Sequence, residues 1–147
     1  MEAVVKLRPG LRLDDLEPTR QAMDGAVRDC LVAGYKPLID KLHLPDPGDR
    51  HILAGAILGR ADVIVTFNEA DFPPEKIKPY GLHTRHPDHF ILDVIDIDPE
   101  ACVERIRWDL GHYRNPPLQL ADYVGALRAA GLTKTADRVS GLETLLT

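Results

Sequence analysis

The sequence predicts an α/β fold, with helices packed on a mainly parallel sheet, followed by a helical C-terminal segment. Residues 62–67 form a short apolar run rich in β-branched side chains, which is typical of a buried parallel strand. This run follows an amphipathic helix and a tight turn, and that order is half of a βαβ unit. After Asp98-Pro99 the apolar spacing is helical only. The 147 residues, 44% of them hydrophobic and 28% charged, are enough for one globular domain.

Helix and turn signals place the other elements in order. Apolar residues recur at helical spacing over residues 14–31. A second helix is expected to begin at Asp46 or Gly48. It presents apolar side chains over residues 52–57 and ends at Gly59. The remaining expected elements are a short helix at 74–79, an edge strand at 82–83, a helix from residue 86 through 95, and helices at 102–110, 118–130 and 132–146.

Charge and cysteine content narrow the class of protein. The 18 basic and 23 acidic residues give a net charge of -5, which argues against a protein that holds nucleic acid by bulk positive charge. Cys30 and Cys102 lie far apart in the sequence and within helical apolar patterns, so we expect both in the core. No apolar run is long enough to span a bilayer and residues 1–10 lack the apolar stretch of a secretory signal, so we expect a cytoplasmic protein.

Three aspartates lie where a helix begins and where the strand ends. Asp46 and Asp49 stand at the start of the second helix, and Asp71 follows the strand. Open parallel sheets bind ligands at the carboxyl ends of their strands, so these carboxylates can converge on one cleft. Hard cations such as Mg²⁺ and Mn²⁺ prefer oxygen ligands, and such a cation would promote hydrolysis of a phosphodiester. Each aspartate alone also has a structural interpretation, as a helix cap or a turn former.

Two polar residues accompany these acids at the end of the strand. Asn68 and Thr66 can orient the carboxylates or a metal-bound water. The structural alternatives are a turn for Asn68 and simple β propensity for Thr66. A serine nucleophile is not supported, because the single serine, Ser140, has no glycine-framed turn around it.

Histidines and aromatic residues in the second half favour structural interpretations. His83, His86 and His89 have a spacing that suggests a transition-metal site, but a proline interrupts their common helical face and no cysteine or glutamate completes a ligand set. A zinc site is therefore not favoured. We expect Trp108 and Tyr113 to pack in the interior rather than stack on bases, because they are not interleaved with a basic patch.

Two stretches of the sequence are similar to a known family. Residues 44–54 (LPDPGDRHILA) and 61–73 (ADVIVTFNEADFP) resemble the C-terminal half of bacterial PIN domains, and more narrowly the VapC-type toxins of toxin–antitoxin pairs. Residues 86–91 (HPDHFI) and 115–118 (NPPL) resemble the branch of that family with a C-terminal helical extension. Together these stretches extend the resemblance over most of the chain.

The resemblance implies a toxin that is a Mg²⁺- or Mn²⁺-dependent endoribonuclease. Its implied partners are a cognate antitoxin, an RNA substrate and further copies of the same chain. The family's third acid falls on Asp49 and its strand-end acid on Asp71, with Asn68 as the supporting asparagine. Asp46, in the same loop, is an auxiliary candidate ligand, and Glu2 is the residue that fits the family's second acid.

The sequence departs from the family pattern at its start. PIN domains begin with a buried strand that ends in an aspartate, and no such segment is present. We therefore expect a PIN-like domain without its first strand at residues 1–96 and a helical extension at residues 97–147. The missing strand would leave a sheet edge and apolar helix faces exposed. Two hypotheses follow: a ribonuclease with metal held by Asp49 and Asp71, or a catalytically inactive PIN remnant that binds an antitoxin or a second copy.

Overall fold

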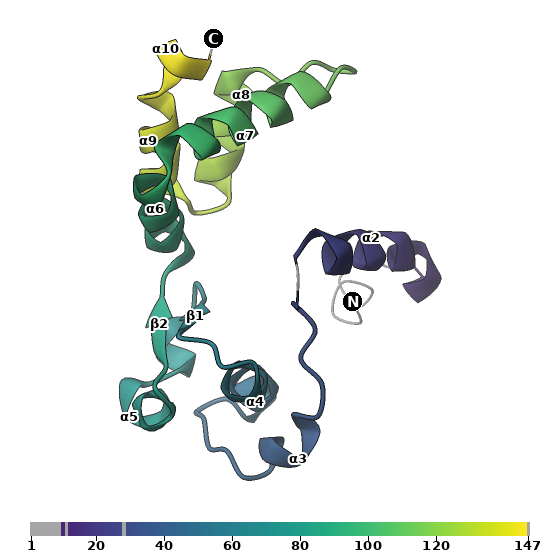
Figure 1. Cartoon of the computed structure of the whole chain (residues 1–147), viewed down its shortest axis with the longest axis vertical. Coiled ribbons are helices and arrows are strands. Elements are labelled where there is room, and N and C mark those ends of the chain that lie inside the picture. The colour runs from purple at the N-terminus through teal and green to yellow at the C-terminus, as the bar shows by residue number, and fades with distance from the viewer. Residues whose placement is uncertain (1–9, 11, 28, 147) are drawn as a thin grey trace.

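The computed structural model describes residue 10, residues 12–27 and residues 29–146. Two groups of elements are joined through β2 and α6, and α2 lies to one side of both groups (Figure 1). The elements are, in order, α2 (Leu13–Ala26), α3 (Lys36–Ile39), η1 (Pro47–Asp49), α4 (Arg50–Leu58), β1 (Val63–Val65), η2 (Glu69–Asp71), α5 (Pro74–Ile77), η3 (Lys78–Tyr80), β2 (His83–Arg85), α6 (Pro87–Ile97), α7 (Pro99–His112), α8 (Leu120–Ala129), α9 (Thr133–Ser140) and α10 (Glu143–Leu146). Helices with a small parallel sheet agree with the α/β class predicted from the sequence.

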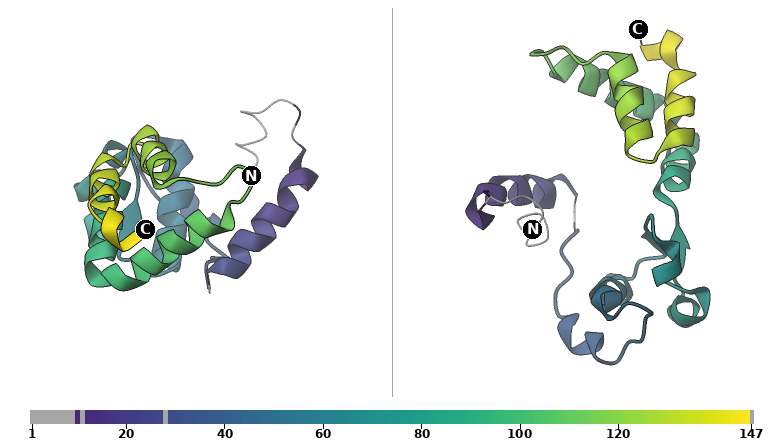
Figure 2. Two further views of the ribbon diagram at one scale, coloured as in Figure 1. Left: turned by 90° about the horizontal axis from the view of Figure 1, so that it is seen from above. Right: turned by 180° about the vertical axis from the view of Figure 1, so that it is seen from behind.

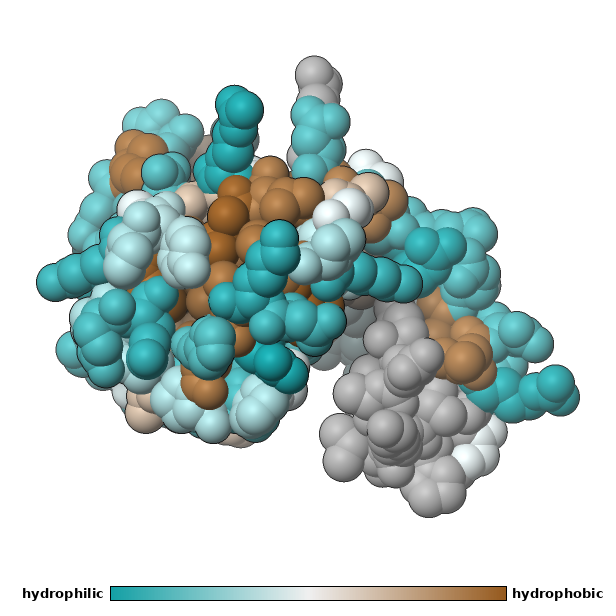
Figure 3. Space-filling view, turned by 90° about the horizontal axis from the view of Figure 1, so that it is seen from below, coloured by the Kyte–Doolittle hydropathy of each residue, from teal (hydrophilic) through white to brown (hydrophobic). Residues whose placement is uncertain are grey.

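The first group is built around α4 and the pair of strands. β1 and β2 run parallel, with Val63 opposite His83. The apolar face of α4 packs inward, where Leu53 and Ala54 are buried. Seen from below, apolar side chains gather at the centre of the molecular surface and polar side chains surround them (Figure 3). The core of this group consists of Leu42, Leu53, Ala54, Ile64, Phe72, Ile77 and Leu82.

The first strand is less buried than its sequence predicts. Ile64 is buried, but Val65 is 41% exposed, and Phe67 just beyond the strand is 58% exposed. A fully buried strand needs a neighbouring strand on each side and a covering layer on each face. Among the described residues, β1 pairs with β2 alone. The prediction of a strand with a parallel partner is confirmed, and the prediction of continuous burial is wrong.

The second group comprises α6 to α10. Val103 and Ile106 of α7 pack against Val139 of α9, and apolar side chains of α8 close this second core. Helix α6 also belongs with this group, because it packs against α9. The two groups therefore have separate apolar cores, one around the strands and one among the C-terminal helices.

One buried carboxylate fixes α6 to the beginning of α9. Asp88 is 4% exposed, and its two carboxylate oxygens accept hydrogen bonds from the backbone N–H groups of Lys134, at 2.9 Å, and Thr135, at 2.8 Å. The Thr135 hydroxyl donates back to the Asp88 carbonyl at 3.2 Å. Burial raises the pKa of Asp88, but these hydrogen bonds outweigh burial and lower it below its usual value. The contact satisfies N–H groups that the first turn of α9 leaves without helical partners.

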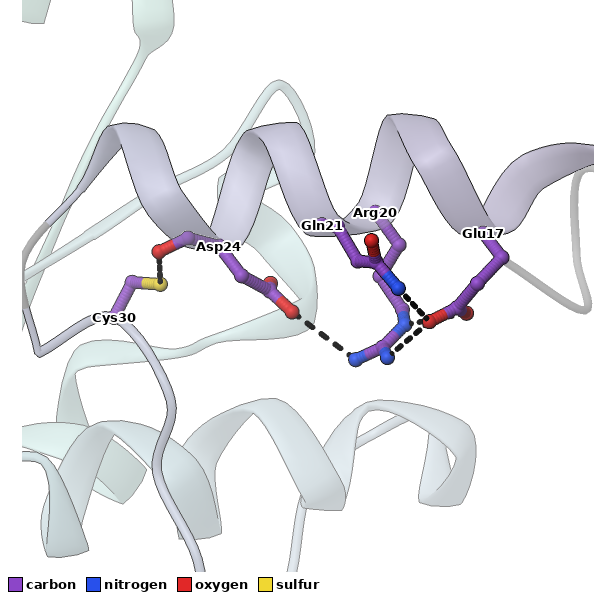
Figure 4. A network of polar contacts seen from close by, with 5 residues as sticks. All are labelled: Glu17, Arg20, Gln21, Asp24 and Cys30. Carbon is purple, nitrogen blue, oxygen red and sulfur yellow. Dashed lines mark hydrogen bonds and ion pairs between the residues drawn. The ribbon is translucent and has the colours of Figure 1, made fainter.

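Helix α2 has no buried residue and is stabilised along its own surface. Figure 4 shows the polar contacts: Arg20 donates to Glu17 at 2.6 and 2.9 Å and to Asp24 at 3.0 Å, and Gln21 donates to Glu17 at 3.1 Å. The hydrogen bonds from Arg20 and Gln21 lower the pKa of Glu17 to about 2. In each view α2 stands apart from the two packed groups (Figure 2).

Two helices end earlier than the sequence predicts. The helix expected over residues 14–31 ends at Ala26, and Asp29 beyond it has a φ of 58°, which a right-handed helix does not accommodate. The helix expected over residues 132–146 is divided into α9 and α10, and Gly141 follows the end of α9. Helix α3 forms at Lys36–Ile39, where the turn residues of the sequence predict a loop, so that prediction is wrong. The remaining expected helices and the edge strand form close to their expected positions.

Neither cysteine lies in the core, where the sequence predicts both. Cys30 is exposed rather than in the core, and its thiol donates to the Asp24 carbonyl at 3.5 Å; it lies after the end of α2, so no helix packs it inward. Cys102 is half-buried, and neither cysteine is in a disulfide. Of the helices that the structure describes, none has the length and apolar character needed to cross a membrane.

Candidate functional site

The candidate site lies where α4 begins and where the chain leaves β1. Asp49 is the last residue of η1 and the N-cap of α4, while Asp71 ends η2, the short turn that follows β1. Asp71 therefore reaches the beginning of α4 from the carboxyl end of the strand. A side-chain hydrogen bond between Asp49 and Asp71 is one of the causes that raise the pKa of Asp49. The helix–strand unit thus brings together two acids that are 22 positions apart (71 − 49) in the chain.

A short polar network holds the strand-end acid in place. The Asn68 side-chain amide donates a hydrogen bond to the Asp71 carboxylate. The backbone N–H of Asn68 in turn donates to the Thr66 hydroxyl at 3.1 Å. Asn68 and Thr66 therefore act together, since one orients the carboxylate and the other fixes the backbone that carries the amide.

The electrostatics of Asp49 mark the two acids as a pair. Burial is the largest cause that raises the pKa of Asp49, and the charges of Asp46 and Asp71 raise it further. A hydrogen bond with Asp71 also raises the pKa of Asp49, whereas the charge of the nearby His51 lowers it. Burial favours the neutral form of Asp49, whereas the negative charges of Asp46 and Asp71 also favour a bound cation.

The donor chemistry of this pair fits a hard divalent cation. Asp49 and Asp71 offer carboxylate oxygens side by side, and Asn68 holds one of them in a fixed orientation. Across the described residues, no group of three or more His, Cys, Asp or Glu side chains is close enough together to hold a metal ion. Two of the predicted ligands therefore come together, and the described part of the chain adds no third ligand of these types.

Asp46 and Glu2 are the other two residues that the sequence predicts as metal ligands. Asp46 is the N-cap of η1, and its carboxylate accepts a hydrogen bond from the Gly48 backbone at 2.6 Å. It thus fills the structural role that the sequence offered as the alternative, while its charge still acts on Asp49. Glu2 lies outside the described residues.

The three histidines do not form a common site. His83 is exposed on β2, whereas His86 caps α6 and accepts a hydrogen bond from the Asp88 backbone at 3.2 Å. His89 lies 2.8 Å from the Lys134 ammonium group, measured from Nε2 to Nζ. His86 therefore caps α6, and His89 links α6 to the beginning of α9.

The prediction that the aromatic residues of α7 are packed inside is wrong. Trp108 is 52% exposed and Tyr113 is 59% exposed. Helical spacing shows which residues share a face but not whether another element covers that face. The feature that identifies this surface in the sequence is the pair of arginines just before the tryptophan, at Arg105 and Arg107.

Comparison with known proteins identifies a family match for the second half of the chain. Residues 87–141 match the family model described as the VapC50 C-terminal domain. Together with the similarity described in the next paragraph, this match supports the assignment of the chain to the VapC-type toxin family, which the sequence motifs predict. The matched segment begins with α6, before the predicted boundary at residues 96 and 97, and that division into domains stays a prediction.

A similar curated protein comes from Mycobacterium tuberculosis. The chain is 42% identical over 94 residues to the protein named "Putative ribonuclease VapC50". The aligned region covers 64% of this chain and 55% of that protein, so the chain spans about half the length of the relative. No solved structure matches the chain.

Proposed function

We propose that the chain acts as a PIN-type toxin, in which the Asp49–Asp71 pair holds Mg²⁺ or Mn²⁺ for endonucleolytic cleavage of RNA. The observation that carries the proposal is the convergence of these two carboxyl groups at the end of β1. The similarity to a protein named as a ribonuclease supports the same activity. A cognate antitoxin is the corresponding protein partner, and the cytoplasmic location expected from the sequence stays a prediction.

The side chains have separate roles in this proposal. A divalent cation, when bound, polarises the scissile phosphate and lowers the pKa of the attacking water. Asp49 and Asp71 supply negative charge and oxygen ligands. Asn68 fixes the Asp71 carboxylate through its hydrogen bond, and Thr66 fixes the backbone of Asn68. Asn68 and Thr66 are therefore positioning residues.

RNA cleavage by wild-type and substituted chains tests this function. Asp49→Asn keeps the size of the side chain but removes its charge, and we expect the Mn²⁺-dependent cleavage rate to fall at least about 100-fold. Asp40→Asn removes the same charge from an exposed residue outside the site and should leave the rate unchanged. Equal rates for the wild type and Asp49→Asn would refute the proposed role of the pair.

A second candidate function is protein binding through α6. Phe90, Val94 and Ile97 expose apolar surface, and Ile97 is 83% exposed. With Val63 they line a hollow of about 340 Å³ beside the two strands. Such a surface favours the alternative of antitoxin binding or self-association.

Light scattering of the purified chain tests the self-associating form of this alternative. An oligomer should dissociate on Ile97→Glu, because the substitution places a charge on the apolar surface. A monomeric wild-type chain, or an oligomer that Ile97→Glu leaves intact, would count against this surface as a self-association site.

A further inference from the structure

The C-terminal half of α7 carries a column of stacked side chains on its surface. The His112 ring stacks on the Trp108 indole with centroids 4.5 Å apart and planes inclined by 20°. The guanidinium carbon of Arg105 lies 4.2 Å from the centroid of the same indole. Since Trp108 is 52% exposed, this column is open to solvent at its edge. The contacts show that the indole accepts both a flat ring and a cation.

A hollow of about 420 Å³ adjoins this column. It contains two arginines and no acidic side chain; its lining residues are Arg107, Trp108, Gly111, His112 and Arg114. Among the described residues, neither Arg107 nor Arg114 forms an ion pair. The end of α7 and the loop that follows it project from the C-terminal group of helices (Figures 1 and 2).

In the part of the chain that the structure describes, acidic side chains near the hollow do not pair with its two arginines, Arg107 and Arg114. Arg105 is paired with Asp109 at 3.2 Å, which leaves its guanidinium on the indole but neutralises its charge. Glu100 and Glu104 line a second hollow that Arg107 also lines, and within the described residues neither forms an ion pair with it. The chain is acidic as a whole, yet this hollow is locally positive and lies next to an exposed aromatic ring.

We propose that this surface of α7 binds an unpaired stretch of RNA. A base extends the column or replaces His112 on the indole, because every base offers a flat face for stacking. Arg107 and Arg114 contact the phosphates on either side of that base. The proposal deepens the proposed ribonuclease function and rests on RNA being the substrate, since it assigns a docking surface for that RNA on the C-terminal helices.

Trp108 is the only tryptophan of the chain, so its fluorescence reports directly on the site. The probe is an oligouridine of about 12 nucleotides, titrated in EDTA so that no metal-dependent cleavage occurs. Binding at the column should quench the indole emission. A duplex of the same length should bind more weakly, because its bases are already stacked on one another.

Substitutions in the hollow give quantitative expectations by anisotropy of labelled RNA. Trp108→Ala should weaken binding about tenfold, and Trp108→Phe should restore part of it by keeping a ring. Removing Arg107 and Arg114 together should lower the slope of log affinity against log salt by about 1.4, which is two phosphate contacts on a single strand. Removing Arg12 and Lys36, which do not line the hollow, is the matched control and should change the slope little.

A glycine pair supplies a test that does not disturb folding. Gly111 and Gly125 are exposed helical residues, and a Cβ at either position would meet nothing within 4 Å. Only Gly111 lines the hollow. Gly111→Glu should therefore reduce RNA binding at least about tenfold, because a carboxylate opposes the phosphate contacts, while Gly125→Glu adds the same charge and should bind as the wild type.

The outcomes separate this inference from the proposed catalytic function. If Gly111→Glu abolishes the quenching and Gly125→Glu preserves it, the result supports RNA binding at this surface of α7, even if the chain cleaves no RNA. Absence of binding, binding without quenching, equal binding of the duplex, or equal binding by the two glutamate variants overturns it, even if the chain cleaves RNA through Asp49.

Discussion

Replacing Asp88 with alanine should weaken the joint between α6 and α9. The side chain is 4% exposed and accepts backbone hydrogen bonds at 2.8 and 2.9 Å from Thr135 and Lys134. Hydrogen bonds to a charged acceptor contribute about 1.5 kcal/mol or more each, so two of them imply a loss of about 3 kcal/mol. At about 2–4 °C for each kcal/mol in a chain of this size, Tm should fall by about 6–12 °C.

A second aspartate of α6 provides the matched control. Asp96 pairs with Arg138 of α9 at 3.3 Å across the same two helices, but both side chains are exposed. Such a pair contributes about 0.5 kcal/mol, so Asp96→Ala should lower Tm by no more than about 2 °C. Thermal melting followed by circular dichroism measures both variants. If Asp88→Ala melts within about 2 °C of Asp96→Ala, the assigned role of the buried carboxylate is wrong.

The pH dependence of this difference follows from the lowered pKa of Asp88. The folded-state pKa lies below the usual value of 3.8, so the contribution of the carboxylate to stability is complete above that value. The contribution is lost as the pH falls through the lowered folded-state pKa. The difference in Tm between the wild type and Asp88→Ala should therefore be largest above about pH 4 and shrink at lower pH.

Two further predictions concern the candidate site. Because burial and neighbouring carboxylates raise the pKa of Asp49, its charge costs stability at neutral pH when no metal is present, and Asp49→Asn should raise Tm in EDTA by about 1–4 °C; an unchanged or lower Tm would contradict this. Asn68→Ala frees the Asp71 carboxylate, so the Kd for Mn²⁺ measured by calorimetry should rise about tenfold; Glu69→Ala, at an exposed neighbour, should leave it unchanged, and equal affinities for these two variants would refute the positioning role.

The sequence predicted the elements around the site because local signals define them. The second helix ends at Leu58 with Gly59 as its cap, and the β-branched run that follows forms β1. These features depend on neighbouring residues only. The convergence of Asp49 and Asp71 could be anticipated because one follows a strand and the other opens the adjacent helix.

Contacts between distant parts of the chain could not be predicted in the same way. The hydrogen bonds from Thr135 to Asp88 join residues 47 positions apart, and no local pattern indicates them. The exposure of Val65 and Trp108 depends on whether another element covers them, which apolar spacing does not specify. For the same reason the sequence placed Trp108 in the interior, although its arginine neighbours were visible.

Calorimetric titration of Mn²⁺ into the chain tests the central claim most directly. The claim is that Asp49 and Asp71 together hold a divalent cation at the end of β1. The wild-type chain should bind Mn²⁺, and Asp49→Asn and Asp71→Asn should each weaken that binding at least about tenfold, because each removes one of the two carboxylates. Mn²⁺ affinities that are the same in the wild type and both variants would contradict the account.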